Sequence, residues 1–206
     1  NDWSAASYWY QMVALSTSAS AITLQGLQAK SFQGDSKVAE LFEQLGVKTT
    51  FSKESEDLLH GGTVELTQTR EVCSRMEYDF VNQPDLAQTF VVTCALLNIP
   101  FHFTGLQSLK IKETDRIAAL IAEMKKLGYI LSEANDSELL WNGERYEASF
   151  VDDAIATYED HRMAMAFAPA TLRLPFLKIS DPGVVTKSYP TYWEALTNLG
   201  FRIETK

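Results

Sequence analysis

Residues 112–131 read KETDRIAALIAEMKKLGYIL, and this stretch predicts both a helix and the unit from which the fold is built. Its apolar side chains recur at helical spacing, and the resulting stripe contains Ile117, Leu120, Ile121, Met124 and Leu127. Two lysines and then Gly128 follow, which predicts that the helix after Lys112 ends at this glycine. The apolar residues beyond the glycine predict a strand.

The same order of elements occurs three times along the chain. In each copy an acidic residue opens a helix, an apolar strand and a loop follow, and a second helix ends in a Leu-Gly pair that leads into another strand. The acidic residues at matching places are Asp2, Asp85 and Asp160. The matching glycines are Gly46, Gly128 and Gly200. Pro84 and Pro190 stand where a first helical residue is expected, and Ser188 is the expected N-cap of the latter helix.

Between the copies, four further stretches predict extra strands: GGTVELTQT at 61–69, MEYDF at 76–80, SELLWNG at 137–143 and EASFV at 147–151. Each unit is therefore of the βαβαββ type, cyclically permuted. Three such units are expected to pack their helices together under a layer of sheet. We predict an α/β fold in a single domain, residues 1–206, with a threefold internal repeat at about 1–75, 76–150 and 151–206.

Composition excludes several classes of protein. The formal net charge of −9 disfavours nucleic acid as a partner. Cys73 and Cys94 lack a CxxC spacing, so we expect no disulfide framework, no metal site and a reducing compartment. No apolar run is long enough for a membrane span and no signal peptide precedes the first residue, which predicts a cytoplasmic protein without a membrane partner. A start without methionine, inside an apolar pattern, suggests a piece of a longer protein.

Cations stand at or just before several expected helix N-termini, which are the helix ends that already favour anions. These cations are Lys112, Arg116, Arg162 and Lys187. In the first copy only Lys37 occupies the corresponding place. A cation is unfavourable at a helix N-terminus unless a negative group lies beside it. If several helix starts converge, they therefore predict a site for an anion.

The stretch KETDR allows two interpretations. In the first it is a charged first turn, in which Glu113 and Asp115 suit the helix dipole and pair with the cations. In the second, Lys112 and Arg116 lie four residues apart on one face and grip a phosphate or carboxylate from two sides. Glu113 beside them could then donate or accept a proton.

The stretch EDHRMAMAFA also has a structural and a functional interpretation. Asp160 can be a helix N-cap, with His161 and Arg162 in an exposed first turn. The polar pair directly precedes an apolar run, however, which places it against a buried helix and favours a functional role. Asp85 follows a helix-starting proline, where aspartate is common for structural reasons, and Lys187 by itself is a weak signal. Two further histidines and four aromatics are expected to be structural: His60, His102, Tyr8, Trp9, Tyr10 and Trp193.

Four motifs, in the chain order PDLAQT, KETDRIAAL, YEDHRMAMAFA and DPGVVTKSYPTYWEAL, together resemble the C-terminal half of the 3-phosphoshikimate 1-carboxyvinyltransferase (EPSP synthase) family. The resemblance implies transfer of the enolpyruvyl group of phosphoenolpyruvate to the 5-hydroxyl of shikimate 3-phosphate, with release of phosphate and with no metal or organic cofactor. It also implies one domain of a two-domain, inside-out α/β barrel. In that fold the substrates bind between domains, where helix N-termini point inwards.

The resemblance implies a role for each candidate residue. Asp85 would bind the shikimate hydroxyls and act as general base, while Lys112 would bridge both substrates and balance developing charge. Glu113 would donate a proton to the methylene carbon of phosphoenolpyruvate. The residues that would hold phosphoenolpyruvate are Arg116, His161, Arg162 and Lys187.

The family's N-terminal motifs are absent from this chain: a glycine-rich lysine loop, a Gly-Asn-Ala-Gly-Thr segment and a Ser-Ser-Gln triplet. The chain is therefore expected to be inactive alone and to need the missing N-terminal domain of the same polypeptide as its partner. Two alternatives stay open. One is a UDP-N-acetylglucosamine enolpyruvyl transferase, and the other is a non-catalytic repeat domain whose cations form only surface ion pairs.

Overall fold

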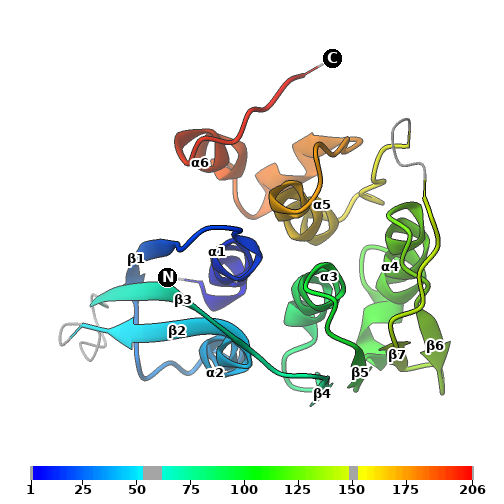
Figure 1. The fold of residues 1–206 in the computed structure, drawn as a ribbon, viewed down its shortest axis with the longest axis horizontal. Coiled ribbons are helices and arrows are strands. Elements are labelled where there is room, and N and C mark those ends of the chain that lie inside the picture. Colours follow the sequence, from blue (N-terminus) through cyan, green and yellow to red (C-terminus); the bar gives the residue numbers. More distant parts are fainter. Residues whose placement is uncertain (1, 53–61, 149–152, 206) are drawn as a thin grey trace.

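Three helices lie side by side at the centre of the computed structural model, which describes residues 2–52, 62–148 and 153–205 (Figure 1). They are α1 (Trp3–Leu15), α3 (Ala87–Leu96) and α5 (His161–Phe167), and α3 contacts both of the others. Every residue of α3 is buried. These helices are apolar nearly all round, and such helices are stable only when other elements cover every face.

A second set of helices lies outside the central three. It comprises α2 (Val38–Glu43), α4 (Arg116–Lys126) and α6 (Tyr192–Asn198). The predicted stripe of α4 is confirmed, since Ile117, Leu120, Met124 and Leu127 are buried and Ile121 is partly buried. The helix begins at Arg116 and not directly after Lys112, because the Asp115 carboxylate accepts a hydrogen bond from the Ala118 N–H at 3.0 Å and caps it.

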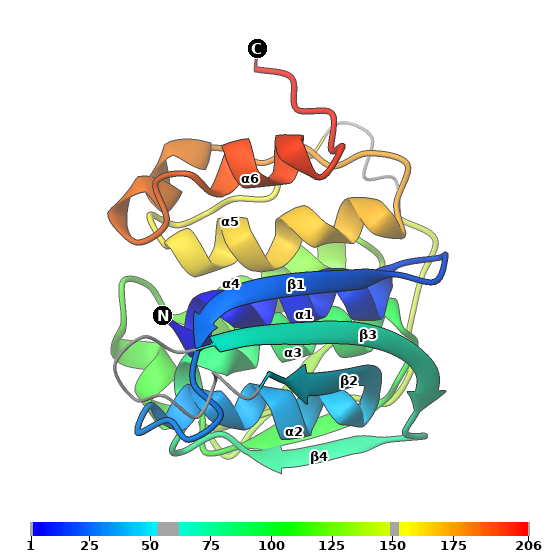
Figure 2. The same ribbon diagram turned by 90° about the vertical axis from the view of Figure 1, so that its left-hand side faces the viewer.

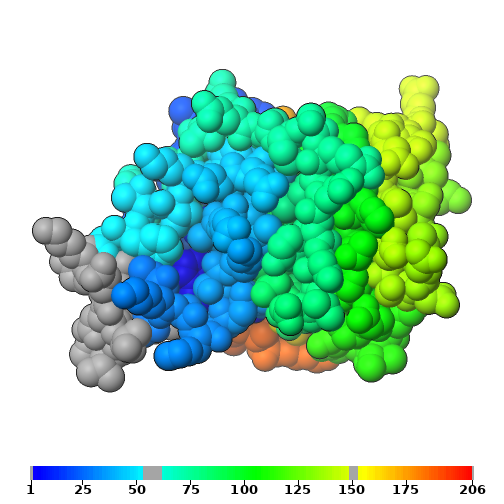
Figure 3. All heavy atoms as spheres, turned by 90° about the horizontal axis from the view of Figure 1, so that it is seen from below, coloured from blue at the N-terminus to red at the C-terminus, as the bar shows by residue number. Residues whose placement is uncertain are grey.

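Two sheets cover the central helices. The first has the antiparallel order β1 (Ala21–Leu27), β3 (Gly62–Val72), β2 (Leu45–Phe51) and lies over α1 (Figure 2). The second has the order β4 (Met76–Asp79), β5 (Phe101–Thr104), β7 (Glu138–Trp141), β6 (Ser132–Ala134). Its β4–β5 pair is parallel and its other pairs are antiparallel. Viewed from below, α2 and the second sheet form one continuous face (Figure 3).

The third segment of the chain differs from the first two. Between 153 and 205 the structure has no strand, and only a parallel bridge joins Ile155 to Ile179. The repeat predicts an apolar strand after the helix that Asp160 opens, here FLKISDP at 176–182, and another strand after Gly200. Both predictions are therefore wrong for these residues. A strand needs a neighbour for its backbone N–H and C=O groups, and no described strand lies beside either stretch. The predicted strand at 147–151 falls mostly outside the described residues.

Short 3-10 helices connect these elements: η1 (Gly34–Lys37), η3 (Pro84–Leu86), η4 (Gln107–Ile111), η5 (Ala168–Leu172) and η6 (Pro182–Lys187). Pro84 starts η3, as predicted. The helix start at Pro190 and the cap at Ser188 are wrong, because α6 begins at Tyr192 and Ser188 ends η6. This stretch forms tight turns instead. The Tyr189 N–H donates a hydrogen bond to the Val185 C=O, and the Tyr192 N–H donates one to the Tyr189 C=O.

Most of the predicted structural side chains are indeed in the core. Tyr8, Trp9 and Tyr10 are buried, and Trp193 is half-buried with its indole N–H donating to the Pro182 carbonyl at 2.9 Å. His102 lies 2.7 Å from a Glu138 carboxylate oxygen across the β5–β7 pair. His60 lies outside the described residues. No helix in the described part of the chain is long and apolar enough to cross a membrane.

Candidate functional site

The carboxylate of Asp85 is the meeting point of three cations. Asp85 belongs to η3, immediately before α3. Its Oδ1 accepts a hydrogen bond from Arg116 Nη1 at 3.0 Å, and its Oδ2 accepts one from Arg162 Nη2 at 2.8 Å. The ammonium of Lys112 lies 3.7 Å from the same Oδ1. Residues at or just before the starts of three helices, α3, α4 and α5, therefore meet here, which is the condition on which the sequence predicts an anion site.

Arg116 is the buried centre of the cluster, with a side chain that is 2% exposed. Besides Asp85, its guanidinium donates from Nε to Asp160 Oδ2 at 2.6 Å and from Nη2 to Glu113 Oε2 at 2.8 Å. A buried guanidinium is stable only when its donors are satisfied. Three carboxylates meet that need. The pair of Arg116 with Glu113 agrees with the first interpretation of KETDR, and the grip of Lys112 and Arg116 on an anion stays a prediction.

Asp160 connects the three helix starts. Its side chain is completely buried and caps α5, with Oδ1 accepting from the Arg162 N–H at 2.8 Å. Its other oxygen accepts from Arg116 Nε and from Gln88 Nε2, the latter at 3.3 Å. The predicted N-cap is therefore confirmed. Because the same carboxylate also binds the side chains of α3 and α4, the cap orients the start of α5 relative to both.

His161 and Arg162 stand at the first two positions of α5. Each has one buried nitrogen, His161 Nδ1 and Arg162 Nε, for which no hydrogen-bond partner exists within the described ranges. A buried polar nitrogen without a partner is costly. Two such atoms on consecutive residues, beside a cluster of cations, indicate a place where a further polar group can bind, and for Arg162 Nε that group must be an acceptor.

The charges around the cluster shift the pKa of three groups. Burial raises the pKa of Asp85, but the neighbouring charges of Arg162, Lys112 and Arg116 outweigh it and leave the pKa below its ordinary value. A hydrogen bond from its own backbone N–H, helped by Arg116, lowers the pKa of Glu113. Burial and then the charge of Arg162 lower the pKa of His161. Without a ligand, Asp85 and Glu113 are therefore ionised and His161 is neutral at pH 7.

The remaining candidate cations lie outside this contact network. Lys187, at the end of η6, donates to the Glu159 carbonyl at 3.2 Å, so it reaches the residue before Asp160 but not the Asp85 carboxylate. Lys110 turns away and pairs with Glu133 at 2.6 Å and with Asp136 at 3.2 Å. Lys37 pairs with Glu40 on its own helix turn. The geometry thus separates Lys112, Arg116 and Arg162 from the other cations.

Comparisons with known proteins show to which family the chain belongs. The sequence profile of the family described as "EPSP synthase (3-phosphoshikimate 1-carboxyvinyltransferase)" matches residues 1–196. The chain belongs to the EPSP synthase family. A 3-phosphoshikimate 1-carboxyvinyltransferase of Bacteroides fragilis is 58% identical over 204 residues, which are 99% of this chain and 47% of that protein. A chloroplastic enzyme of the same name from Petunia hybrida is 31% identical over 95% of this chain and 36% of its own length.

A solved structure also matches the fold. The EPSP synthase of Acinetobacter baumannii superposes with a TM-score of 0.76 at 22% identity, over 98% of this chain and 46% of that one. At this identity the likeness concerns the fold alone. This member of the EPSP synthase family therefore spans about half the length of the Bacteroides relative that it matches.

Two further members of the cluster carried only a weak signal in the sequence. Gln88 lies three residues after Asp85. Residues at this spacing lie on the same face of a helix, so the sequence could have indicated that Gln88 lies near Asp85. Tyr8 comes from α1, distant in the sequence, and was predicted only as a core residue. Its hydroxyl faces Arg162, and burial raises its pKa to about 12. Only the packing of α1 against α3 and η3 brings it to this family's candidate site.

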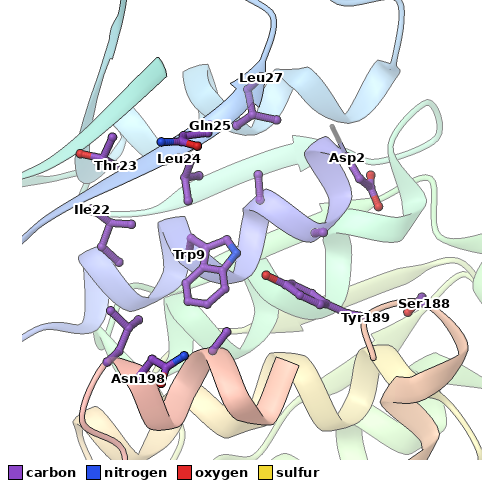
Figure 4. A pocket seen from close by; sticks show the side chains of 14 residues that line it. Asp2, Trp9, Ile22, Thr23, Leu24, Gln25, Leu27, Ser188, Tyr189 and Asn198 are labelled. Carbon is purple, nitrogen blue, oxygen red and sulfur yellow. The ribbon is translucent and has the colours of Figure 1, made fainter. Parts of the chain in front are cut away.

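A hollow of about 590 Å³ lies elsewhere, between α1, β1 and the segment around α6 (Figure 4). Its walls are mainly apolar and include Trp9, Ile22, Leu24 and Tyr189. None of the cations of the Asp85 cluster lines it. It therefore does not match the anion site that the sequence predicts, and the candidate site of this EPSP synthase family member stays at Asp85. Within the described part of the chain, no group of acidic, histidine or cysteine side chains could hold a metal ion.

Proposed function

We propose that this chain is the C-terminal half of a 3-phosphoshikimate 1-carboxyvinyltransferase. The complete protein would transfer the enolpyruvyl group of phosphoenolpyruvate to the 5-hydroxyl of shikimate 3-phosphate in the shikimate pathway and release phosphate. The other partner in the site would be the N-terminal domain of the same polypeptide, and the protein would act in the cytoplasm. We also propose that residues 1–206 form one domain that arose by threefold repetition, within an inside-out α/β barrel.

One observation carries this proposal: the cations of α4 and α5 meet around the Asp85 carboxylate at the start of α3. The two substrates of the proposed reaction each carry one phosphate and one carboxylate. Preorganised cations stabilise such charges more strongly than mobile ones, since no reorganisation is needed during the reaction. Lys112 has a side chain that is 35% exposed, so it is accessible to a ligand above the cluster.

The proposed base and acid are both ionised in the ligand-free state, which suits Asp85 as a base better than Glu113 as an acid. Anionic substrates would change this balance. By binding the cations they would weaken the attraction that lowers both pKa values, and their own negative charge would raise them further. We propose that substrate binding, through this effect, allows Glu113 to protonate the methylene carbon and Asp85 to accept the hydroxyl proton.

Arg116, Arg162, His161 and Lys187 are proposed to hold phosphoenolpyruvate. The contacts support this differently for each. Arg162 and His161 each have an unpartnered buried nitrogen within the described ranges. Arg116 already makes four hydrogen bonds to carboxylate oxygens, which occupy most of its five N–H donors. For Arg116 we therefore propose one direct contact at most, with its main effect exerted through Asp85 and Glu113.

The decisive experiment measures phosphate release from phosphoenolpyruvate by the full-length parent protein, with shikimate 3-phosphate or UDP-N-acetylglucosamine as acceptor. We expect release with shikimate 3-phosphate only, and none from this chain alone. Release with UDP-N-acetylglucosamine would favour the related transferase. No release with either acceptor from a folded parent would leave the non-catalytic alternative.

Variants then test the cluster. Lys112→Ala and Arg162→Ala in the parent should each lower kcat/KM by about 100- to 1000-fold, as is usual when one group that stabilises the transition state is lost. Lys110→Ala is the matched control, since it removes a lysine two residues from Lys112 that pairs with Glu133 and Asp136. Equal losses in the Lys110 and Lys112 variants would contradict the assignment.

A further inference from the structure

A strained turn leads directly into the candidate site. The N–H of Asp160 donates to the Thr157 carbonyl at 2.8 Å, which closes a turn whose central residues are Tyr158 and Glu159. Both have left-handed backbone conformations, with φ of 53° and 59°. Turns with positive φ at both central positions normally use glycine, asparagine or aspartate, because a Cβ is crowded there. A tyrosine and a glutamate need support from elsewhere to stay in this conformation.

Glu123 of α4 supplies that support. Its side chain is completely buried. One carboxylate oxygen accepts a hydrogen bond from the chain before the turn, and the other accepts one from a residue within the turn. Oε1 accepts a hydrogen bond from the Tyr158 hydroxyl at 2.7 Å, and Oε2 accepts one from the Ala156 N–H at 3.0 Å. One helical turn further on, Lys126 lies 2.7 Å from Oε2 and donates to the Ala154 carbonyl at 2.9 Å.

The chain before the turn is also held on its other side, by hydrogen bonds to the backbone of residues 178–180. Ile155 donates its N–H to the Lys178 carbonyl at 2.8 Å and accepts from the Ser180 N–H at 2.9 Å. Figure 1 shows the yellow segment running from the side of α4 towards the start of α5. The chain before the turn is thus held between α4 and residues 178–180, and only residues 158 and 159 remain to set the direction in which α5 begins.

Two parts of the candidate site depend on that direction. Asp160, the last residue of the turn, caps α5 and binds Arg116. The carbonyl of Glu159 accepts the hydrogen bond from the Lys187 ammonium. The helix α4 therefore grips this region twice, through Arg116 at its first residue and through Glu123 two turns later. Movement of the turn would shift His161 and Arg162 together with both contacts.

We propose that Glu123 is a positioning residue of the site, which acts through the strained Thr157–Asp160 turn to place Asp160, His161 and Arg162. This inference rests on the proposed function for its kinetic consequence, but the contact between Glu123 and the turn does not. The Glu123 side chain is completely buried, and we assign it no part in the chemistry.

The test compares Glu123→Gln with wild type in the full-length parent. Glutamine keeps the shape of the side chain, but it is neutral and has one acceptor oxygen in place of two. The Tyr158 hydroxyl would lose its charged acceptor and would have to accept from the amide instead, and the pair with Lys126 would be lost, so the turn should loosen. We expect kcat/KM for phosphate release to fall by about 10- to 100-fold, the usual effect of a displacement near 1 Å at a reacting group. Amide hydrogen exchange over residues 154–162, followed by mass spectrometry, should become faster. Lys125→Gln, on an exposed residue of the same helix, should change neither quantity.

A rescue variant separates positioning from simple stability. Glu159→Gly removes one Cβ from a left-handed position while keeping the carbonyl that binds Lys187, so the turn should need less support. We expect Glu123→Gln/Glu159→Gly to recover most of the lost kcat/KM and of the protection from exchange. If Glu123→Gln is insoluble, Tyr158→Phe deletes only the hydroxyl that Glu123 binds, and a smaller loss in the same direction is expected.

The proposal would be overturned by a Glu123→Gln enzyme with a lower unfolding midpoint but unchanged kcat/KM and unchanged exchange over 154–162. It would also be overturned if glycine at 159 restored neither quantity. A wild-type parent that releases no phosphate would end the proposed function. The exchange measurements would still decide whether Glu123 holds the turn.

Discussion

Arg116 and Asp160 form a buried ion pair that joins the start of α4 to the start of α5, with 2.6 Å between Nε and Oδ2. Both side chains are at least 98% buried, and each makes several further hydrogen bonds. A buried pair of this kind contributes little net stability compared with apolar residues of the same size. Breaking it is costly, because the remaining charge loses its partner.

Asp160→Asn should lower the free energy of unfolding by about 3 kcal/mol, the lower end for a broken buried pair. The lower end is expected because Asp85 and Glu113 still face Arg116. Urea unfolding followed by circular dichroism measures this. Asp181→Asn is the control, since Asp181 is exposed and its side chain caps nothing. Equal losses of unfolding free energy in both variants would mean that breaking the buried ion pair costs no more than changing an exposed aspartate.

Acid should destabilise the fold through Asp85. Its folded-state pKa is below the ordinary value, so around and below pH 4 the unfolded chain binds more protons than the folded one. The stability that ionised Asp85 contributes to the fold is therefore complete above the unfolded-state pKa, about 3.9. It is lost as the pH falls through the folded-state pKa. In Asp85→Asn the urea midpoint should fall less steeply with acid than in wild type. An unchanged slope, with Asp181→Asn again as control, would refute this.

Ligand binding should be visible at His161. Burial and the charge of Arg162 keep its pKa low in the free protein. A bound anion would offset that positive charge, so phosphoenolpyruvate should raise the pKa. An NMR titration of the histidine ring protons of the full-length parent measures this, with and without phosphoenolpyruvate, and His161→Gln identifies the signal. A pKa that stays constant while phosphoenolpyruvate binds would place the anion away from α5.

Two glycines allow the stability cost of a positive φ to be measured separately from the cost of a steric clash. Gly128 and Gly143 both have positive φ, 89° and 100°. A Cβ on Gly128 would lie 2.7 Å from the Tyr146 carbonyl oxygen, whereas one on Gly143 would meet nothing within 4 Å. Gly143→Ala should therefore cost about 1 kcal/mol of stability for its conformation alone. Gly128→Ala should cost at least about 1 kcal/mol more. Chemical denaturation compares the two, and equal costs would show that the carbonyl can move aside.

Local features of the chain were readable without a structure because neighbouring residues determine them. The apolar stripe of α4 depends only on helical spacing, and Asp160 before an apolar run is enough to predict a cap. Pro84 likewise marks the start of η3. The predictions are wrong where residues distant in the sequence determine the local structure. The strands expected in the third segment have no described neighbour to pair with, and Ser188 does not cap a helix because the chain there is used for tight turns.

The sequence alone determined which residue types stand at the helix starts, and with them the family and the expectation of an anion site. The tertiary structure decided which of these residues meet. Lys110 and Lys112 are two positions apart, yet only Lys112 approaches Asp85, since Lys110 pairs with Glu133 and Asp136. Spacing along a chain limits which side chains share a face. Charges from different elements interact only where packing brings them within a few ångströms, and that distance depends on the whole core.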